Sequence, residues 1–268
     1  MTTDPGGAAR RVLPRRDLIA VVSALAGTTA LAWIYLVRAA AGMGEPAMSM
    51  EMVRIQAWDA GDFAMIFLMW TIMMVGMMVP SAAPTTMVYA GVARKAERQG
   101  SVVAPTGVFV AGYIALWALF SVFATAGQWV LDQAALLSPM MVATSPLVGA
   151  VLLVTAGVYQ VTPIKLACLK NCQSPMHFIS EHWRPGIAGA FRMGLHHGTY
   201  CVGCCWVLMC LLFLGGVMNL LWIAAIAIFV FGEKVMPVRH AQTASRVTGA
   251  GMVLVGVVLL VKWTVGSG

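Results

Sequence analysis

The chain has 268 residues, of which 60% are hydrophobic and only 10% are charged. Soluble domains average about 45–50% apolar and about 25% charged residues, so this composition argues against a water-soluble globular fold. The net charge of +7 does not indicate nucleic-acid binding either, because the basic residues lie between apolar blocks and no basic run interleaves with aromatic residues. The apolar blocks are long enough for transmembrane helices, and we expect an all-α membrane protein.

The N-terminal segment, residues 1–17, is basic and is expected to lie in the cytoplasm. The apolar stretch from Leu18 to Val37 has about the length of a bilayer span and is longer than the core of a typical signal peptide. Ala39–Ala41 resembles a cleavage site, but a retained first helix is the better interpretation. We expect residues 18–268 to form a single membrane domain.

The apolar blocks predict a polytopic bundle of about seven transmembrane helices. In chain order these helices cover about 18–40, 62–91, 104–127, 146–166, 187–215, 217–236 and 244–264. The second helix contains Pro80 and Pro84 and is expected to bend or break there. The fifth contains His196, His197 and Gly203, so it is expected either to be kinked or to enter the bilayer after an amphipathic start.

The distribution of basic residues predicts the orientation of the bundle. With a cytoplasmic N-terminus, fourteen of the 17 lysine and arginine residues fall on the inner side, and only Arg38, Arg54 and Lys262 fall on the outer side. Such a bias follows the positive-inside rule. We expect the N-terminus inside and the C-terminus outside, in a bacterial cytoplasmic membrane.

Most of the cysteine and histidine residues lie close together in the sequence. The segment from Cys168 to Cys205 holds Cys168, Cys172, His177, His182, His196, His197, Cys201, Cys204 and Cys205. Thiolate and imidazole are ligands that soft or borderline metals such as Cu(I) and Zn(II) prefer. The cluster therefore points to metal binding.

Helical spacing groups these residues further. Cys201, Cys204 and Cys205 stand at i, i+3 and i+4, and His197 lies one turn earlier, so one helix face would present three sulfurs and a nitrogen. Cys168 and Cys172 are four residues apart and share a face in the same way. His177 and His182 are better explained as interfacial histidines, and Cys210 as a buried structural cysteine. A disulfide framework is disfavoured because the predicted orientation places the cluster at the reducing side.

Twenty methionines form a second feature. Met43, Met48, Met50 and Met52 lie in the predicted outer loop, where a solvated segment has little use for thioethers, and they are candidates for metal capture. The methionines of the second helix, such as Met69 and Met73, are better explained as core residues. Because thioethers bind Cu(I) but hold Zn(II) poorly, copper is favoured over zinc. Glu233 and Lys234, at the inner end of the sixth helix, are interpreted as a snorkelling ion pair.

Two blocks of the sequence resemble a bacterial family of integral membrane proteins described only as metal-binding. They are WTIMMVGMMVPSAAP, at residues 70–84, and a longer block that runs through YQVTPIKLACLKNCQSP, HWRPGIAGAFRMGLHHGTYCVGCCW and GVMNLLWIAAIAIFVFGEK. With the surrounding helices, the resemblance covers about residues 62–236. It implies metal binding at the matching positions Cys168, Cys172, Cys201, Cys204 and Cys205.

The leading hypothesis is a membrane protein that captures, handles or transfers Cu(I). The loop methionines Met43, Met48, Met50 and Met52 would collect the metal. The inner cluster would receive it through Cys168, Cys172, His196, His197, Cys201, Cys204 and Cys205. The alternatives are a thiol redox protein that exchanges electrons with a quinone or a partner thiol, and a non-catalytic accessory subunit of a membrane enzyme. Expected partners are the lipid bilayer, a metallochaperone or a membrane enzyme, and a second copy of the chain.

Overall fold

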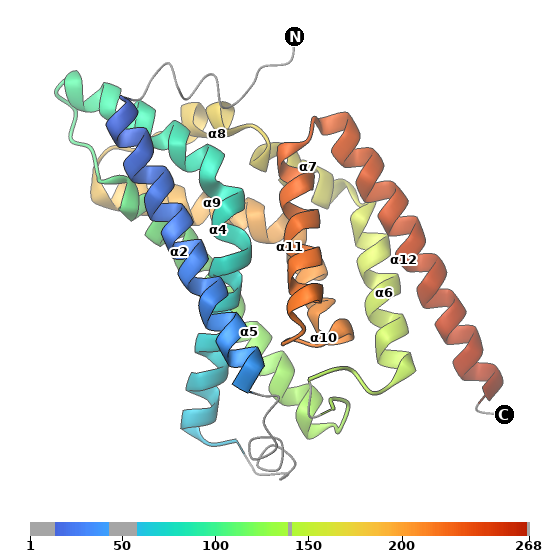
Figure 1. Cartoon of the computed structure of the whole chain (residues 1–268). Coiled ribbons are helices and arrows are strands. Elements are labelled where there is room, and N and C mark those ends of the chain that lie inside the picture. Colours follow the sequence, from blue (N-terminus) through green and yellow to red (C-terminus); the bar gives the residue numbers. More distant parts are fainter. Residues whose placement is uncertain (1–13, 43–57, 139–140, 267–268) are drawn as a thin grey trace.

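The structure is a computed structural model that describes residues 14–42, 58–138 and 141–266 (Figure 1). The helices are α2 (Arg15–Gly42), α4 (Ala60–Arg98), α5 (Thr106–Gln133), α6 (Pro146–Gln160), α7 (Pro163–Cys172), α8 (Pro175–His182), α9 (Gly186–Cys210), α10 (Leu212–Gly215), α11 (Leu220–Val235) and α12 (Val238–Gly266). Within the described ranges, the only β-type pairing is an isolated bridge between Leu137 and Ala143. The predicted all-α fold class is confirmed.

The expectation of seven spanning helices is wrong. In the described part of the chain, five helical segments are long and apolar enough to cross a membrane, and α6 with α7 makes a sixth if the pair counts as one span bent by 65°. The predicted helix 146–166 breaks because Thr162 is extended and Pro163 begins a new helix. At 16 residues, α11 is shorter than the roughly 20 residues that a bilayer span requires.

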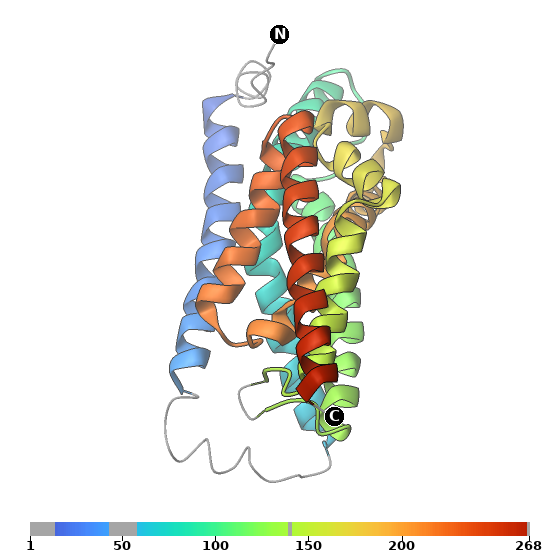
Figure 2. The same ribbon diagram turned by 90° about the vertical axis from the view of Figure 1, so that its right-hand side faces the viewer.

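The helices form two halves joined by α11 (Figures 1 and 2). In one half α4 packs against α2 and α5, and α5 packs against α9; in the other half α6 packs along α12. Between the halves lies α11, which contacts both α4 and α12. The beginning of α2 and the end of α12 lie at opposite ends of the bundle (Figure 1).

Helix α4 continues through both of its prolines, so the expected break is not present. Pro80 has no N–H to donate to the carbonyl of Gly76, four residues earlier. The indole Nε1 of Trp33, on α2, donates to that carbonyl instead, over 3.2 Å. This hydrogen bond from a neighbouring helix satisfies the freed carbonyl and ties α2 to the middle of α4.

Glycines allow α5 and α9 to touch through their backbones. A Cβ atom on Gly112 would lie 2.2 Å from the carbonyl oxygen of Phe191, and one on Gly194 would lie 2.0 Å from that of Phe109. Small residues permit such close approach between apolar helices. Helix α9 is continuous from Gly186 to Cys210, so it does not break at His196, His197 or Gly203. Its cysteine-bearing face is therefore held deep in the bundle.

The connection between α6 and α9 folds into two short helices, α7 and α8. Prolines occupy the first turn of both, with Pro163 opening α7 and Pro175 opening α8. Helix α7 folds back at the bend after α6 and packs against α9. The carboxyl end of α7, with Cys172, thereby reaches the cysteines of α9.

Candidate functional site

Four buried cysteines meet where α7 packs against α9. We call Cys172, Cys201, Cys204 and Cys205 the sulfur cluster; all four are buried free thiols. The four belong to one buried apolar cluster, in which the thiols of Cys172 and Cys205 lie near those of Cys201 and Cys204. The helix spacing correctly predicted that Cys201, Cys204 and Cys205 share one face.

Backbone oxygen atoms hold two of these thiols in place. Both Cys204 and Cys205 donate from Sγ to the carbonyl oxygen of Cys201, over 3.1 and 3.0 Å. These bonds follow from the i, i+3 and i+4 spacing, because a helical side chain points back toward the preceding turn. The thiols are therefore oriented by their own helix.

A lysine from α11 reaches the sulfur cluster, which the sequence did not lead us to expect. The Nζ of Lys234 donates to Sγ of Cys201 over 2.9 Å and to Oγ of Ser81 over 3.0 Å, and it lies 4.0 Å from Sδ of Met78. The hydroxyl of Tyr113 donates to the carbonyl of Met78 over 3.0 Å and also lies 3.0 Å from Sγ of Cys201. Helices α4, α5, α9 and α11 thus converge on Cys201.

The interpretation of Glu233 and Lys234 as a snorkelling ion pair is wrong. Both side chains are buried, and Glu233 pairs instead with Lys165, whose Nζ lies 2.6 Å from Oε1. Lys165 also donates to Ser245, over 3.0 Å, and to Gln160. The two charges of α11 separate because consecutive helical residues point about 100° apart. Glu233 therefore faces α7 and α12, while Lys234 faces α4 and α9.

Several methionines share the apolar core with the cysteines. Met69, Met73, Met74, Met77, Met78 and Met209 are buried in the same apolar core as the sulfur cluster. Met65, near the beginning of α4, is instead 59% exposed. The loop residues Met43, Met48, Met50 and Met52, which we expected to capture metal, lie outside the described residues.

The histidines divide into two places. His197 is buried on the cysteine face of α9, with its ring 5.3 Å from that of Phe178 and 5.7 Å from that of Tyr113. Within the described residues its Nδ1 atom has no hydrogen-bond partner. The ring of His196 instead lies 4.3 Å from that of His182, on α8.

The remaining cysteines lie at the edge of this arrangement. Cys168 is partly buried and packs against Gly203, where an added Cβ would lie 2.8 Å from its Sγ. Cys210 ends α9, one turn beyond Cys205 and outside the contacts of the sulfur cluster. Of the seven cysteine and histidine ligands expected in the inner cluster, the structure gathers four cysteines in one buried cluster and places His197 one turn before Cys201.

The sulfur cluster is not a closed metal site as it stands. Across residues 14–42, 58–138 and 141–266, no group of three or more histidine, cysteine, aspartate or glutamate side chains has an arrangement that could hold a metal ion. Methionine is not among these residue types. The thiols of Cys204 and Cys205 are held by the backbone of their own helix, and that of Cys201 accepts from Lys234, which also lies 4.0 Å from Sδ of Met78.

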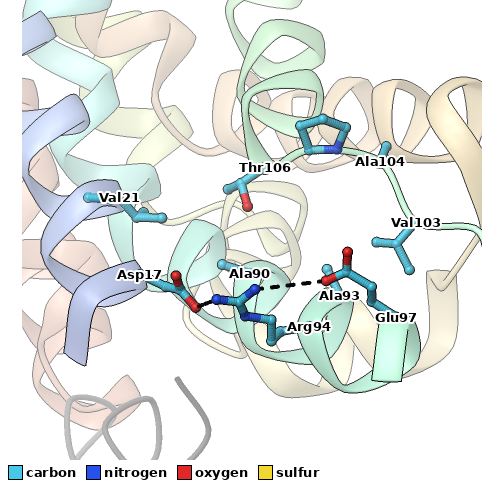
Figure 3. A pocket seen from close by; sticks show the side chains of 11 residues that line it. Asp17, Val21, Ala90, Ala93, Arg94, Glu97, Val103, Ala104 and Thr106 are labelled. Carbon is cyan, nitrogen blue, oxygen red and sulfur yellow. Dashed lines mark hydrogen bonds and ion pairs between the residues drawn. The ribbon is translucent and has the colours of Figure 1, made fainter. Parts of the chain in front are cut away.

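Two cavities lie apart from the sulfur cluster. One, of about 330 Å³, lies between α2, the end of α4 and the start of α5. Figure 3 shows Arg94 in this cavity, paired with Asp17 on one side and facing Glu97 at 4.0 Å on the other. The second, of about 210 Å³, is lined by His182, Arg184, Arg192, Met193 and His196. Neither cavity contains a cysteine.

Comparison with known proteins links the chain to copper. The family described as PpoB2, copper chaperone, matches residues 67–259, which include α5 to α11, most of α4 and all residues of the sulfur cluster. No curated protein matches the chain, and no solved structure matches it. Because the family match covers well over half of its length, this chain belongs to the PpoB2 copper chaperone family.

Proposed function

We propose that this protein binds Cu(I) at the sulfur cluster within a membrane and passes it to a partner. The observation that carries the proposal is the gathering of four buried free thiols from two helices in one core that is rich in methionine. Thiolates and thioethers are the ligands that favour Cu(I), whereas oxygen ligands suit harder cations. Copper is the metal that the family description names.

Binding would begin with loss of thiol protons, because the thiolate is the form that ligates metal. A deprotonated Cys204 or Cys205 can no longer donate to the carbonyl oxygen of Cys201, which frees its Sγ to turn toward a metal. Cys172 then supplies a sulfur from the opposite helix. The thioether of Met78 offers a further ligand that needs no deprotonation.

A membrane location is supported by the exterior of the bundle. Large apolar side chains are exposed along α2, α5 and α12, including Leu31, Phe123 and Leu254. Contact of these apolar surfaces with lipid tails carries no hydrophobic penalty, whereas their contact with water is unfavourable. With the positive-inside bias, we propose a multi-pass protein of a bacterial cytoplasmic membrane whose N-terminus is cytoplasmic. Met43, Met48, Met50 and Met52 remain proposed collectors of copper.

The test is the metal content of the full-length protein and of a variant with Cys201, Cys204 and Cys205 replaced by serine. Both proteins are purified in detergent, loaded with Cu(I) under reducing anaerobic conditions, desalted and measured by elemental analysis. Competition with a chromogenic Cu(I) chelator gives the affinity. We expect the triple variant to lose the tightly bound copper. Cys210→Ser is the matched control, because Cys210 lies on the same helix but outside the sulfur cluster.

Full copper content in the triple variant would contradict the proposed site. Thiol redox chemistry is the competing function, because Cys172 lies in one cluster with the cysteines of α9, and oxidation of two of these thiols would join α7 to α9 by a disulfide. Counting thiols before and after a mild oxidant, in metal-free protein, separates the two functions. A metal-binding protein should take up Cu(I) with all of its thiols reduced, and Cu(I) should then protect them from the oxidant.

A further inference from the structure

The sulfur cluster contains a buried positive charge of its own. Lys234 is only 8% exposed, and its Nζ donates to Sγ of Cys201 and to Oγ of Ser81. In the described part of the chain, no carboxylate lies within ion-pair distance of its Nζ. The neighbouring Glu233 is already engaged by Lys165. The ammonium therefore has the sulfurs as its only available counter-charge among the described residues.

A metal bound at Cys201 would lie close to this ammonium. A metal–sulfur bond of about 2.3 Å adds to the 2.9 Å between Sγ and Nζ, so the metal would be about 4–5 Å from the positive charge. At that separation, and with little water present, the repulsion between Lys234 and the metal depends strongly on the metal's charge. The attraction between Lys234 and the thiolates is the same for every metal that binds the same number of them.

Charge balance then discriminates between ions. With two thiolates, Cu(I) and the ammonium together give a neutral site, whereas a divalent ion such as Zn(II) leaves one net positive charge. A buried net charge is unfavourable in an apolar environment. A divalent ion could restore neutrality only by removing one more thiol proton. For any given number of thiolates, the fixed charge therefore shifts the preference toward the lower-valent metal.

We propose that Lys234 is a specificity-determining residue, whose fixed positive charge makes the sulfur cluster select a monovalent soft cation over divalent cations. This inference rests on the proposed function, because it concerns the same site. It adds a physical reason for the preference for Cu(I) and names the residue that provides it. Tetrahedral cysteine sites commonly bind Zn(II), so ligand type alone would not exclude zinc here.

The experiment compares the affinities of the full-length protein for Cu(I) and for Zn(II), each measured by competition with a chromogenic chelator. Lys234→Leu removes the charge without adding a sulfur ligand, and Lys234→Gln also removes it but keeps a donor for Ser81. Lys234→Arg keeps the charge. At an effective dielectric constant near 20, removing a unit charge about 5 Å away should lower the ratio of Cu(I) to Zn(II) affinity on the order of 100-fold. The arginine variant should change the ratio less than about fivefold.

The controls distinguish a failure of the proposed role of Lys234 from a failure of the proposed copper site. Ser81→Ala removes a neutral partner of Lys234 and should leave the ratio within about fivefold of the wild type. If the leucine variant does not fold, as judged by gel filtration and circular dichroism, the glutamine variant gives the same comparison. An unchanged ratio in a folded, copper-binding uncharged variant would overturn the role of Lys234 while leaving the proposed function intact. If the wild type binds no Cu(I) at the cysteines, both proposals are wrong.

Discussion

Removing one partner of the buried pair between Lys165 and Glu233 should destabilise the protein far more than removing both. The side chains are 0% and 3% exposed, and their charged atoms are 2.6 Å apart. Lys165→Met leaves the carboxylate of Glu233 buried, with Ser245 as its only side-chain donor among the described residues. Breaking a buried pair in this way costs about 3–5 kcal/mol. At about 2–4 °C per kcal/mol, the midpoint of thermal unfolding should fall by roughly 6–20 °C.

The double variant Lys165→Met with Glu233→Gln removes both charges and keeps an amide oxygen that can accept from Ser245. It should be at least about 2 kcal/mol more stable than Lys165→Met alone, because no uncompensated charge remains. Thermal unfolding in detergent, followed by circular dichroism, measures all four members of the cycle. If the double variant shows the simple sum of the two single losses, the side chains do not interact and the reasoning is refuted.

Two further changes test the packing of the bundle by the same thermal assay. Gly194→Ala should lower the free energy of unfolding by about 1–3 kcal/mol, because the added methyl group meets the carbonyl of Phe109. The control Gly107→Ala, on α5, meets nothing within 4 Å and should change stability by less than about 1 kcal/mol. Equal effects of the two variants would contradict the backbone contact between α5 and α9. Trp33→Phe should cost about 1–3 kcal/mol, because it leaves the carbonyl of Gly76 without the indole donor; a variant as stable as the wild type would show that another group satisfies that carbonyl.

The long helices could be predicted because a continuous apolar run of about 20 residues strongly favours a transmembrane helix. The predicted helix at 18–40 is part of α2, and the one at 244–264 is part of α12. The short helices α7 and α8 were missed because neither has the length or hydropathy of a span. Pro163 and Pro175, which open them, were available signals, since proline is favoured in the first turn of a helix.

For the site, local spacing could be predicted but contact between helices could not. The positions of Cys201, Cys204 and Cys205 follow from helical periodicity alone. The contact with Cys172 depends on the bend after α6, which no local pattern specifies. Lys234 was misplaced because a charge near the end of an apolar segment usually reaches water. Here α11 is shorter than its neighbours and lies between them, so the end of the helix is still inside the protein.

Glu233 and Lys234 are consecutive residues, so the position of α11 along its axis determines both the ion pair with Lys165 and the hydrogen bond to Cys201. Sliding α11 along its axis by one residue, or inserting a residue before Glu233, would take the carboxylate from Lys165 and the ammonium from Cys201 in the same step. Mispaired arrangements of the two halves of the bundle are therefore penalised twice. Apolar contacts alone would allow a short helix several positions along its axis, whereas the two buried polar interactions favour one. Correct packing of the two halves therefore also places Lys234 at the sulfur cluster.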